Sequence, residues 1–139
     1  MEIDITDLME KCQEINASDI HLTVGIPPTI RANGRLVRLG ETALRPADTL
    51  SLAQSFLDDK QFAILEETGE YDISVSASGK YRFRVNIFRQ RGTYAVAMRN
   101  VNSTLLTLEQ LGMPAAIRDF TKKSYGIVLV TGPTGSGKS

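Results

Sequence analysis

Three consecutive segments, 71–77, 80–90 and 93–101, alternate polar and apolar side chains and are separated by glycines. Such alternation is typical of strands that bury one face. Gly79 and Gly92 supply the turns between the segments. We therefore predict an antiparallel meander of three strands. This meander constrains the fold more than any other feature, because it assigns a long continuous part of the chain to one sheet.

The region before the meander combines helical and strand patterns. Asp4 suits the N-cap of an amphipathic helix, because apolar residues recur at helical spacing after it. Asn33-Gly34 favours the left-handed dihedral angles of a tight hairpin turn. We therefore expect a helix over 5–15, a strand over 19–24, and a hairpin built from strands 29–32 and 35–39.

Two further helices are predicted between this hairpin and the meander. Pro46 suits the first turn of a helix, where its missing N–H is not needed. The pair Asp58-Asp59 is expected to cap the next helix, which continues through Leu65 and ends before Gly69.

The residues after the meander change in character. Thr107 and Gln110 have the spacing of a capping box, which predicts a short helix that stops at Gly112, with another beginning at Pro114. Residues 127–130 are continuously apolar, as expected for a parallel strand buried on both faces.

These patterns together predict an α+β fold followed by the start of an α/β domain. The expected organisation is an α+β domain over 1–101, a linker with short helices over 102–124, and the first strand and loop of the second domain over 125–139.

Charge and cysteine content restrict the expected surroundings of the chain. Sixteen basic residues balance sixteen acidic ones, but residues 1–79 carry a net charge of 6 − 14 = −8 and residues 80–123 one of 9 − 2 = +7. The basic block should face solvent or an anionic partner. Cys12 is the single cysteine, which excludes an internal disulfide and fits a reducing cytoplasm. The sequence contains neither a secretory signal nor an apolar run long enough to cross a bilayer, so any membrane role should be peripheral.

The final eight residues carry a phosphate-binding motif. They fit G-x-x-x-x-G-K-[ST] without deviation and directly follow the predicted buried strand. Lys138 would reach the β- and γ-phosphates of ATP, and the Ser139 hydroxyl would bind Mg²⁺. A flexible Gly/Ser-rich tail is the alternative interpretation. The expected nucleotide-binding residues are Gly132, Pro133, Thr134, Gly135, Ser136, Gly137, Lys138 and Ser139.

A working loop of this kind continues into a helix whose N-terminal dipole favours the phosphates. The sequence stops at Ser139, before that helix. We therefore expect these 139 residues alone neither to hydrolyse ATP nor to bind it tightly.

The middle strand of the meander predicts a basic face. Its Arg82, Arg84 and Asn86 should share one face, opposite to Tyr81 and Phe83, and a turn near Gly92 would bring Arg99 of the next strand close to them. Like charges placed opposite each other destabilise a sheet, so this cluster suggests a polyanionic ligand. An ordinary solvated face is the alternative.

RNA binding on the sheet is a third interpretation of the same cluster. That mode requires aromatic side chains beside the basic ones, on which bases can stack. Tyr81 and Phe83 lie on the opposite face in this pattern, so we expect no nucleic-acid partner.

The sequence as a whole resembles the PilT-type twitching-motility ATPases of type IV pili, within the wider secretion ATPase superfamily. The phosphate loop is common to the superfamily, whereas the combination of motifs is more specific. The resemblance is carried by Ala17-Ser18-Asp19-Ile20-His21-Leu22, Arg82-Phe83-Arg84-Val85-Asn86, Leu108-Glu109-Gln110-Leu111-Gly112-Met113, and Val128-Leu129-Val130-Thr131-Gly132 through Ser139.

This resemblance implies a PAS-like N-terminal domain over 1–101 and a RecA-like ATPase domain that starts within 125–139. It also implies a homohexameric ring at the cytoplasmic face of the inner membrane. Such a ring would hydrolyse ATP and drive pilus retraction through the inner-membrane platform protein.

The resemblance further assigns a role to two arginines. Arg84 and Arg99 match the family positions whose side chains reach the nucleotide phosphates when the two domains close. Arginine suits this role because it is always charged and pairs bidentately with phosphate. Together with Lys138 they are the expected catalytic residues. Extension motors and type II secretion ATPases are the related alternatives, although a domain that begins near Met1 favours retraction, because extension motors usually carry an additional N-terminal domain.

Other chemically interesting residues have weaker claims. His21 is the single histidine and has no partners for a metal site, so we expect a structural role for it. Cys12 should lie in the core. A non-enzymatic regulatory domain that precedes a nucleotide-binding domain is the main rival function.

Overall fold

The computed structural model describes residues 4–77, 81–101 and 107–132. The chain divides into two compact units, Met1–Ser103 and Thr104–Ser139. The first unit contains all of the strands described and three of the helices, and the second contains one short helix. The first unit is therefore a mixed α+β domain, as the sequence predicts.

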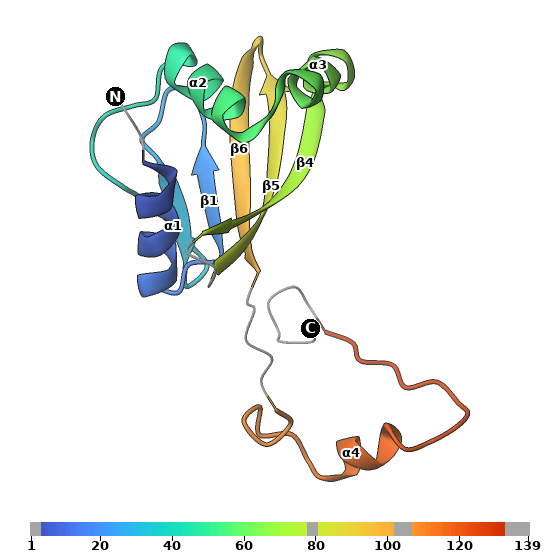
Figure 1. Ribbon diagram of the computed structural model, residues 1–139. Helices are drawn as coiled ribbons and strands as arrows, with labels where there is room; N and C mark the ends of the chain where they lie inside the picture. The colour runs from blue at the N-terminus through green and yellow to red at the C-terminus, as the bar shows by residue number, and fades with distance from the viewer. Residues whose placement is uncertain (1–3, 78–80, 102–106, 133–139) are drawn as a thin grey trace. The chain divides into compact units, whose positions relative to one another are not determined.

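A six-stranded antiparallel sheet forms the first unit (Figure 1). The predicted meander is confirmed, and its third strand also pairs with β1, so the hairpin before it extends the same sheet. The spatial order is β3-β2-β1-β6-β5-β4. The strands are β1 (Asp19–Leu22), β2 (Thr29–Ala32), β3 (Arg35–Arg38), β4 (Glu70–Ala77), β5 (Tyr81–Gln90) and β6 (Thr93–Val101).

Tight turns at described residues close two of the hairpins of this sheet. Asn33 and Gly34 have φ angles of 49° and 76°, which confirms the predicted turn between β2 and β3. Arg91 and Gly92 have φ angles of 52° and 76° between β5 and β6. Positive φ at both central residues matches the right-handed twist of the flanking strands.

Each helix of the first unit begins near the residue that the sequence predicts. Asp4 accepts hydrogen bonds from the first turn of α1 (Ile5–Glu14), at 2.8 Å from the Thr6 nitrogen. Pro46 begins α2 (Pro46–Phe56). Asp58 and Gln61 form a capping box at the start of α3 (Asp59–Thr68), which ends at Gly69 with a φ of 87°.

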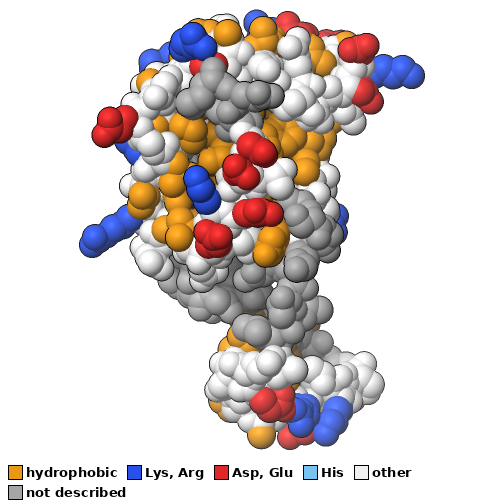
Figure 2. All heavy atoms as spheres, turned by 60° about the vertical axis from the view of Figure 1, so that its left-hand side comes forward, with side chains coloured by type: hydrophobic (Ala, Val, Ile, Leu, Met, Phe, Trp, Pro, Cys, Tyr) orange, Lys and Arg blue, Asp and Glu red, His pale blue; other side chains and the backbone are white. Residues whose placement is uncertain are grey.

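The three helices pack on one face of the sheet and form the core with it (Figure 1). Helix α1 contacts β1, α2 contacts β6, and α3 contacts β4 and β5. The outer side of α1 is acidic, and Figure 2 brings this side forward. The largest fully buried side chains include Phe83, Met9, Ile20, Leu22, Ile30 and Ile87.

The second unit agrees with its predicted structure only in part. Thr107 and Gln110 exchange the predicted capping-box hydrogen bonds, but residues 108–112 form a turn rather than a helix. The expected helix after Pro114 is α4 (Ala116–Phe120).

The predicted strand over 127–130 is not formed. These residues belong to no strand, and the exposed fraction of Ile127 is 86% and that of Leu129 is 81%. A parallel strand needs neighbours that satisfy its backbone groups and cover both faces. The described residues of the second unit, 107–132, provide no such neighbour.

Candidate functional site

The sheet face opposite to the helices carries a row of charged residues at matching positions of neighbouring strands. Arg84 of β5 lies directly opposite Arg99 of β6, which confirms that the predicted arginines are adjacent. On its other side, Arg99 lies opposite Asp19 of β1, and Asp19 lies opposite Arg31 of β2. Side chains at such positions have Cβ atoms about 5 Å apart, close enough to interact.

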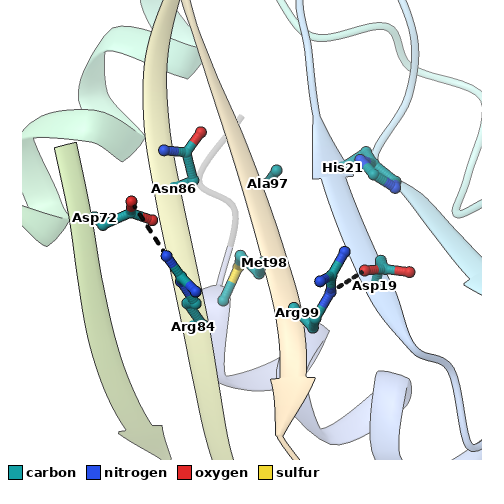
Figure 3. A pocket seen from close by; sticks show the side chains of 8 residues that line it. All are labelled: Asp19, His21, Asp72, Arg84, Asn86, Ala97, Met98 and Arg99. Atoms are coloured by element: carbon teal, nitrogen blue, oxygen red, sulfur yellow. Dashed lines mark hydrogen bonds and ion pairs between the residues drawn. The ribbon is translucent and has the colours of Figure 1, made fainter. Parts of the chain in front are cut away.

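Two aspartates neutralise these arginines (Figure 3). The Asp19 carboxylate accepts a hydrogen bond from Nε of Arg99 at 3.2 Å and also pairs with Nε of Arg31 at 3.5 Å. Asp72 of β4 lies 3.5 Å from Nη2 of Arg84. The face is therefore an alternating arrangement of charges rather than a simple basic patch.

The side chain of Asp19 is much more buried than those of Arg84 and Arg99. Only 16% of its side chain is exposed, against 76% for Arg99 and 68% for Arg84. Burial alone would raise the pKa of the Asp19 carboxyl, but hydrogen bonds from Ser18 and Arg99 and the charge of Arg99 lower that pKa below its ordinary value. Asp19 is therefore ionised at neutral pH and can serve as a fixed negative charge.

A concavity of about 300 Å³ lies over this row. Arg84 and Arg99 border it, and the small side chain of Ala97 leaves space beside them (Figure 3). This volume is at the lower end of the range for small-molecule sites. The concavity is lined by Asp19, His21, Asp72, Arg84, Asn86, Ala97, Met98 and Arg99.

The arrangement suits the binding of an anion. Arginine pairs with phosphate bidentately, and the exposed guanidinium groups of Arg84 and Arg99 can be reached from solvent. Metal binding has no support in the described part of the chain, where no group of three or more His, Cys, Asp or Glu side chains is placed to hold an ion.

His21 borders the same concavity, two residues after Asp19 on β1. Its Nε2 atom is buried and has no hydrogen-bond partner among the described residues. Cys12 lies fully in the core, as predicted, and its thiol donates to the carbonyl oxygen of Ala17 at 3.3 Å. Burial, with a contribution from the charge of Asp19, raises the pKa of Cys12 to about 11, so the thiol is protonated and unreactive at neutral pH.

The predicted phosphate loop falls largely outside the described residues. Gly132 is described and is exposed at the end of the apolar segment. Pro133, Thr134, Gly135, Ser136, Gly137, Lys138 and Ser139 all lie outside the described ranges.

The acidic partners Asp19 and Asp72 are the part of the site that sequence reasoning missed. Alternation places Asp19 on the polar face of its strand, but it does not tell which strand lies beside it. The pairing of β1 with β6 joins residues about 80 positions apart, such as Asp19 and Arg99. The register of β4 on β5 places Asp72 opposite Asn86, which lies two residues from Arg84 along β5.

Comparison with known proteins places this domain in a family. The family model described as "Type II/IV secretion system protein" matches residues 1–139. The chain belongs to this family. Two curated members of similar sequence are the type IV pilus retraction ATPase PilT of Pseudomonas aeruginosa, 40% identical over 99% of the chain, and the type IV pilus ATPase PilU of the same organism, 31% identical over 99%.

A solved structure agrees with this assignment. The crystal structure of the pilus retraction motor PilT with bound ADP matches 99% of the chain with a TM-score of 0.81 and 39% identity. The chain spans 40% of the length of that protein and 36% to 40% of the two curated relatives. Among the described residues, none of the helices is long and apolar enough to cross a membrane.

Proposed function

We propose that this chain is part of an ATP-hydrolysing motor and that its sheet domain presents Arg84 and Arg99 to the phosphates of ATP. The observation that carries this proposal is the placement of the two arginines directly opposite each other at the edge of an open concavity. A pair of guanidinium groups can stabilise the charge of a γ-phosphate during transfer. Similarity to an ATPase whose structure contains ADP supports the choice of ligand.

In this proposal the phosphate loop supplies the other half of the site. Residues Gly132 to Ser139 would surround the phosphates with backbone N–H groups, Lys138 would contact the β- and γ-phosphates, and the Ser139 hydroxyl would bind Mg²⁺. Mg²⁺ would neutralise charge that develops on the phosphate oxygens. Because this half-site needs a following helix, residues 1–139 alone should be inactive.

The proposed domain organisation is a PAS-like domain over 1–101, a linker over 102–124 and the start of a RecA-like domain over 125–139. The exposed apolar residues 127–130 support this organisation, because an uncovered run of this kind gains stability when neighbouring strands pair with it. The same segment would then lead into the phosphate loop.

The whole protein is proposed to work as a homohexamer at the cytoplasmic face of the inner membrane. It would drive type IV pilus retraction through the platform protein, without a nucleic-acid partner. Similarity to a retraction ATPase supports this choice. Pilus extension and type II secretion are the alternatives, and the name of the matching family includes secretion.

The test compares the whole protein with its Lys138→Ala variant. We expect ATPase activity and ring formation in the wild type, and loss of ATPase activity with an unchanged fold in the variant. The release of phosphate from ATP measures the ATPase activity, and analytical ultracentrifugation measures ring formation. Absence of ATPase activity in the folded wild type would instead favour a non-enzymatic regulatory domain.

A further inference from the structure

The two arginines of the open face are held by their aspartates in different ways. Asp19 contacts Arg99 through Nε, at 3.2 Å. Asp72 contacts Arg84 through Nη2, one of the two terminal nitrogens, at 3.5 Å. This difference determines which guanidinium atoms remain available to an incoming phosphate.

Arg99 keeps its terminal nitrogens available. Within residues 4–77 and 81–101, Arg99 donates a side-chain hydrogen bond through Nε and none through Nη1 or Nη2. The Asp19 carboxylate that holds Nε is itself held by Ser18, whose hydroxyl donates to it at 2.8 Å, and by Arg31 on the same oxygen. Arg99 is therefore held through Nε, and its exposed side chain leaves the terminal nitrogens available to a ligand.

Arg84 is in the opposite situation. Its ion pair with Asp72 uses a nitrogen that bidentate phosphate binding would require. Half of the Asp72 side chain is exposed, as is 68% of the Arg84 side chain, so solvent screens the pair and makes it weak. A phosphate that binds Arg84 through both terminal nitrogens has to displace the Asp72 carboxylate.

We propose that Asp19 is a positioning residue that orients Arg99 for phosphate, whereas Asp72 is a counter-ion that competes with phosphate for Arg84. This inference rests on the proposed function, in which both arginines contact phosphate. It assigns opposite effects to two carboxylates that carry the same charge and border the same concavity.

The opposite effects expected for Asp19 and Asp72 on phosphate binding distinguish this inference from a purely electrostatic explanation. Removal of either negative charge makes the face more positive, so charge alone predicts stronger anion binding for both Asp19→Asn and Asp72→Asn. Loss of the Asp19 tether also frees a long side chain, whose ordering then costs entropy on binding. The positioning role predicts that this second effect dominates at Asp19.

The experiment titrates inorganic tripolyphosphate into the 139-residue chain carrying Lys138→Ala, which removes the lysine contact of the phosphate loop. NMR signals of the arginine Nε–H groups report binding at Arg84 and Arg99 separately. We expect Asp72→Asn to tighten binding about twofold to fivefold, the range of an exposed ion pair. Asp19→Asn should weaken it by about threefold or more and should accelerate solvent exchange of the Arg99 Nε–H.

A double-mutant cycle distinguishes positioning from general damage to the fold. In an Arg99→Ala background, Asp19→Asn should no longer weaken binding, and the amide spectrum should show a folded domain throughout. Tighter binding by both asparagine variants would overturn the inference but not the proposed role of the arginines. A weakening by Asp19→Asn that persists in the Arg99→Ala background would do the same. Tripolyphosphate binding that does not depend on Arg84 or Arg99 would overturn both the inference and their proposed role.

Discussion

The two units of the chain respond differently to the same kind of sequence signal. In Met1–Ser103, apolar residues on strands and helices pack against each other and are buried. Phe83, for example, is completely buried. In Thr104–Ser139, an even more apolar run, 127–130, remains exposed and forms no strand. Hydrophobic pattern therefore predicts structure where its partners are present in the same unit.

Capping signals show the same contrast on a smaller scale. Asp58 and Gln61 cap a helix of ten residues that packs on the sheet. Thr107 and Gln110 make equivalent hydrogen bonds, yet only a single turn follows. A cap satisfies the first backbone groups, but most of the stability of a helix in a protein comes from packing its apolar face.

The largest expected effect comes from truncating an apolar side chain in each unit. Phe83→Ala should lower the free energy of unfolding by about 3 to 5 kcal/mol, because it leaves a cavity in the core. Leu129→Ala is the matched control and should change it by less than about 0.5 kcal/mol, because Leu129 is exposed. Urea denaturation followed by circular dichroism measures both. A comparable loss in the two variants would show that the units share one core.

Removal of the two caps should give a smaller difference of the same kind. Asp58→Ala should lower the free energy of unfolding by about 1 kcal/mol, the ordinary effect of losing an N-cap. Thr107→Ala should leave the main urea transition unchanged, since Thr107 belongs to the second unit and not to the sheet domain. A shift of the transition midpoint by Thr107→Ala would contradict the expectation that the two units contribute independently to stability.

The smallest expected effect concerns acid. The folded-state pKa of Asp19 is lowered, so its contribution to stability is present above the unfolded-state pKa of about 3.9 and is lost as pH falls through the folded-state pKa. Asp19→Asn should therefore lose less stability than the wild type on acidification below about pH 4. The control Glu109→Gln removes the pairing with Arg118 in the second unit and should leave the pH dependence of the sheet domain unchanged. Urea midpoints measured across this pH range compare the two variants with the wild type. An identical pH dependence in Asp19→Asn and wild type would contradict the proposed contribution of Asp19 to stability.

Much of the sheet domain could be predicted because its signals are local. The residues Asp4, Asn33-Gly34, Pro46 and Asp58 each act within a few positions, and the corresponding elements begin or turn where they stand. Alternation along β5 and β6 also predicts the shared face of Arg84 and Arg99, because a short turn fixes the register between consecutive strands.

The remaining features depend on contacts between distant parts of the chain. The pairing of β1 with β6, which brings Asp19 beside Arg99, does not follow from alternation. Alternation determines which face of the sheet a side chain lies on, but not which strand lies next to it. The exposed run 127–130 shows the converse case, since its composition predicts a buried strand without supplying the strands that would bury it.

The most direct test of the account measures ATP hydrolysis by the whole protein after substitution of each arginine. Arg84→Ala and Arg99→Ala should each lower kcat by at least about tenfold, because arginines that stabilise a transferring phosphate have large effects on rate. Arg35→Ala is the matched control, since Arg35 is exposed on the same sheet but lies opposite Ala32, at the edge away from the arginine pair. It should leave kcat unchanged. Wild-type kcat in both Arg84→Ala and Arg99→Ala would contradict the proposal that this face contacts the phosphates.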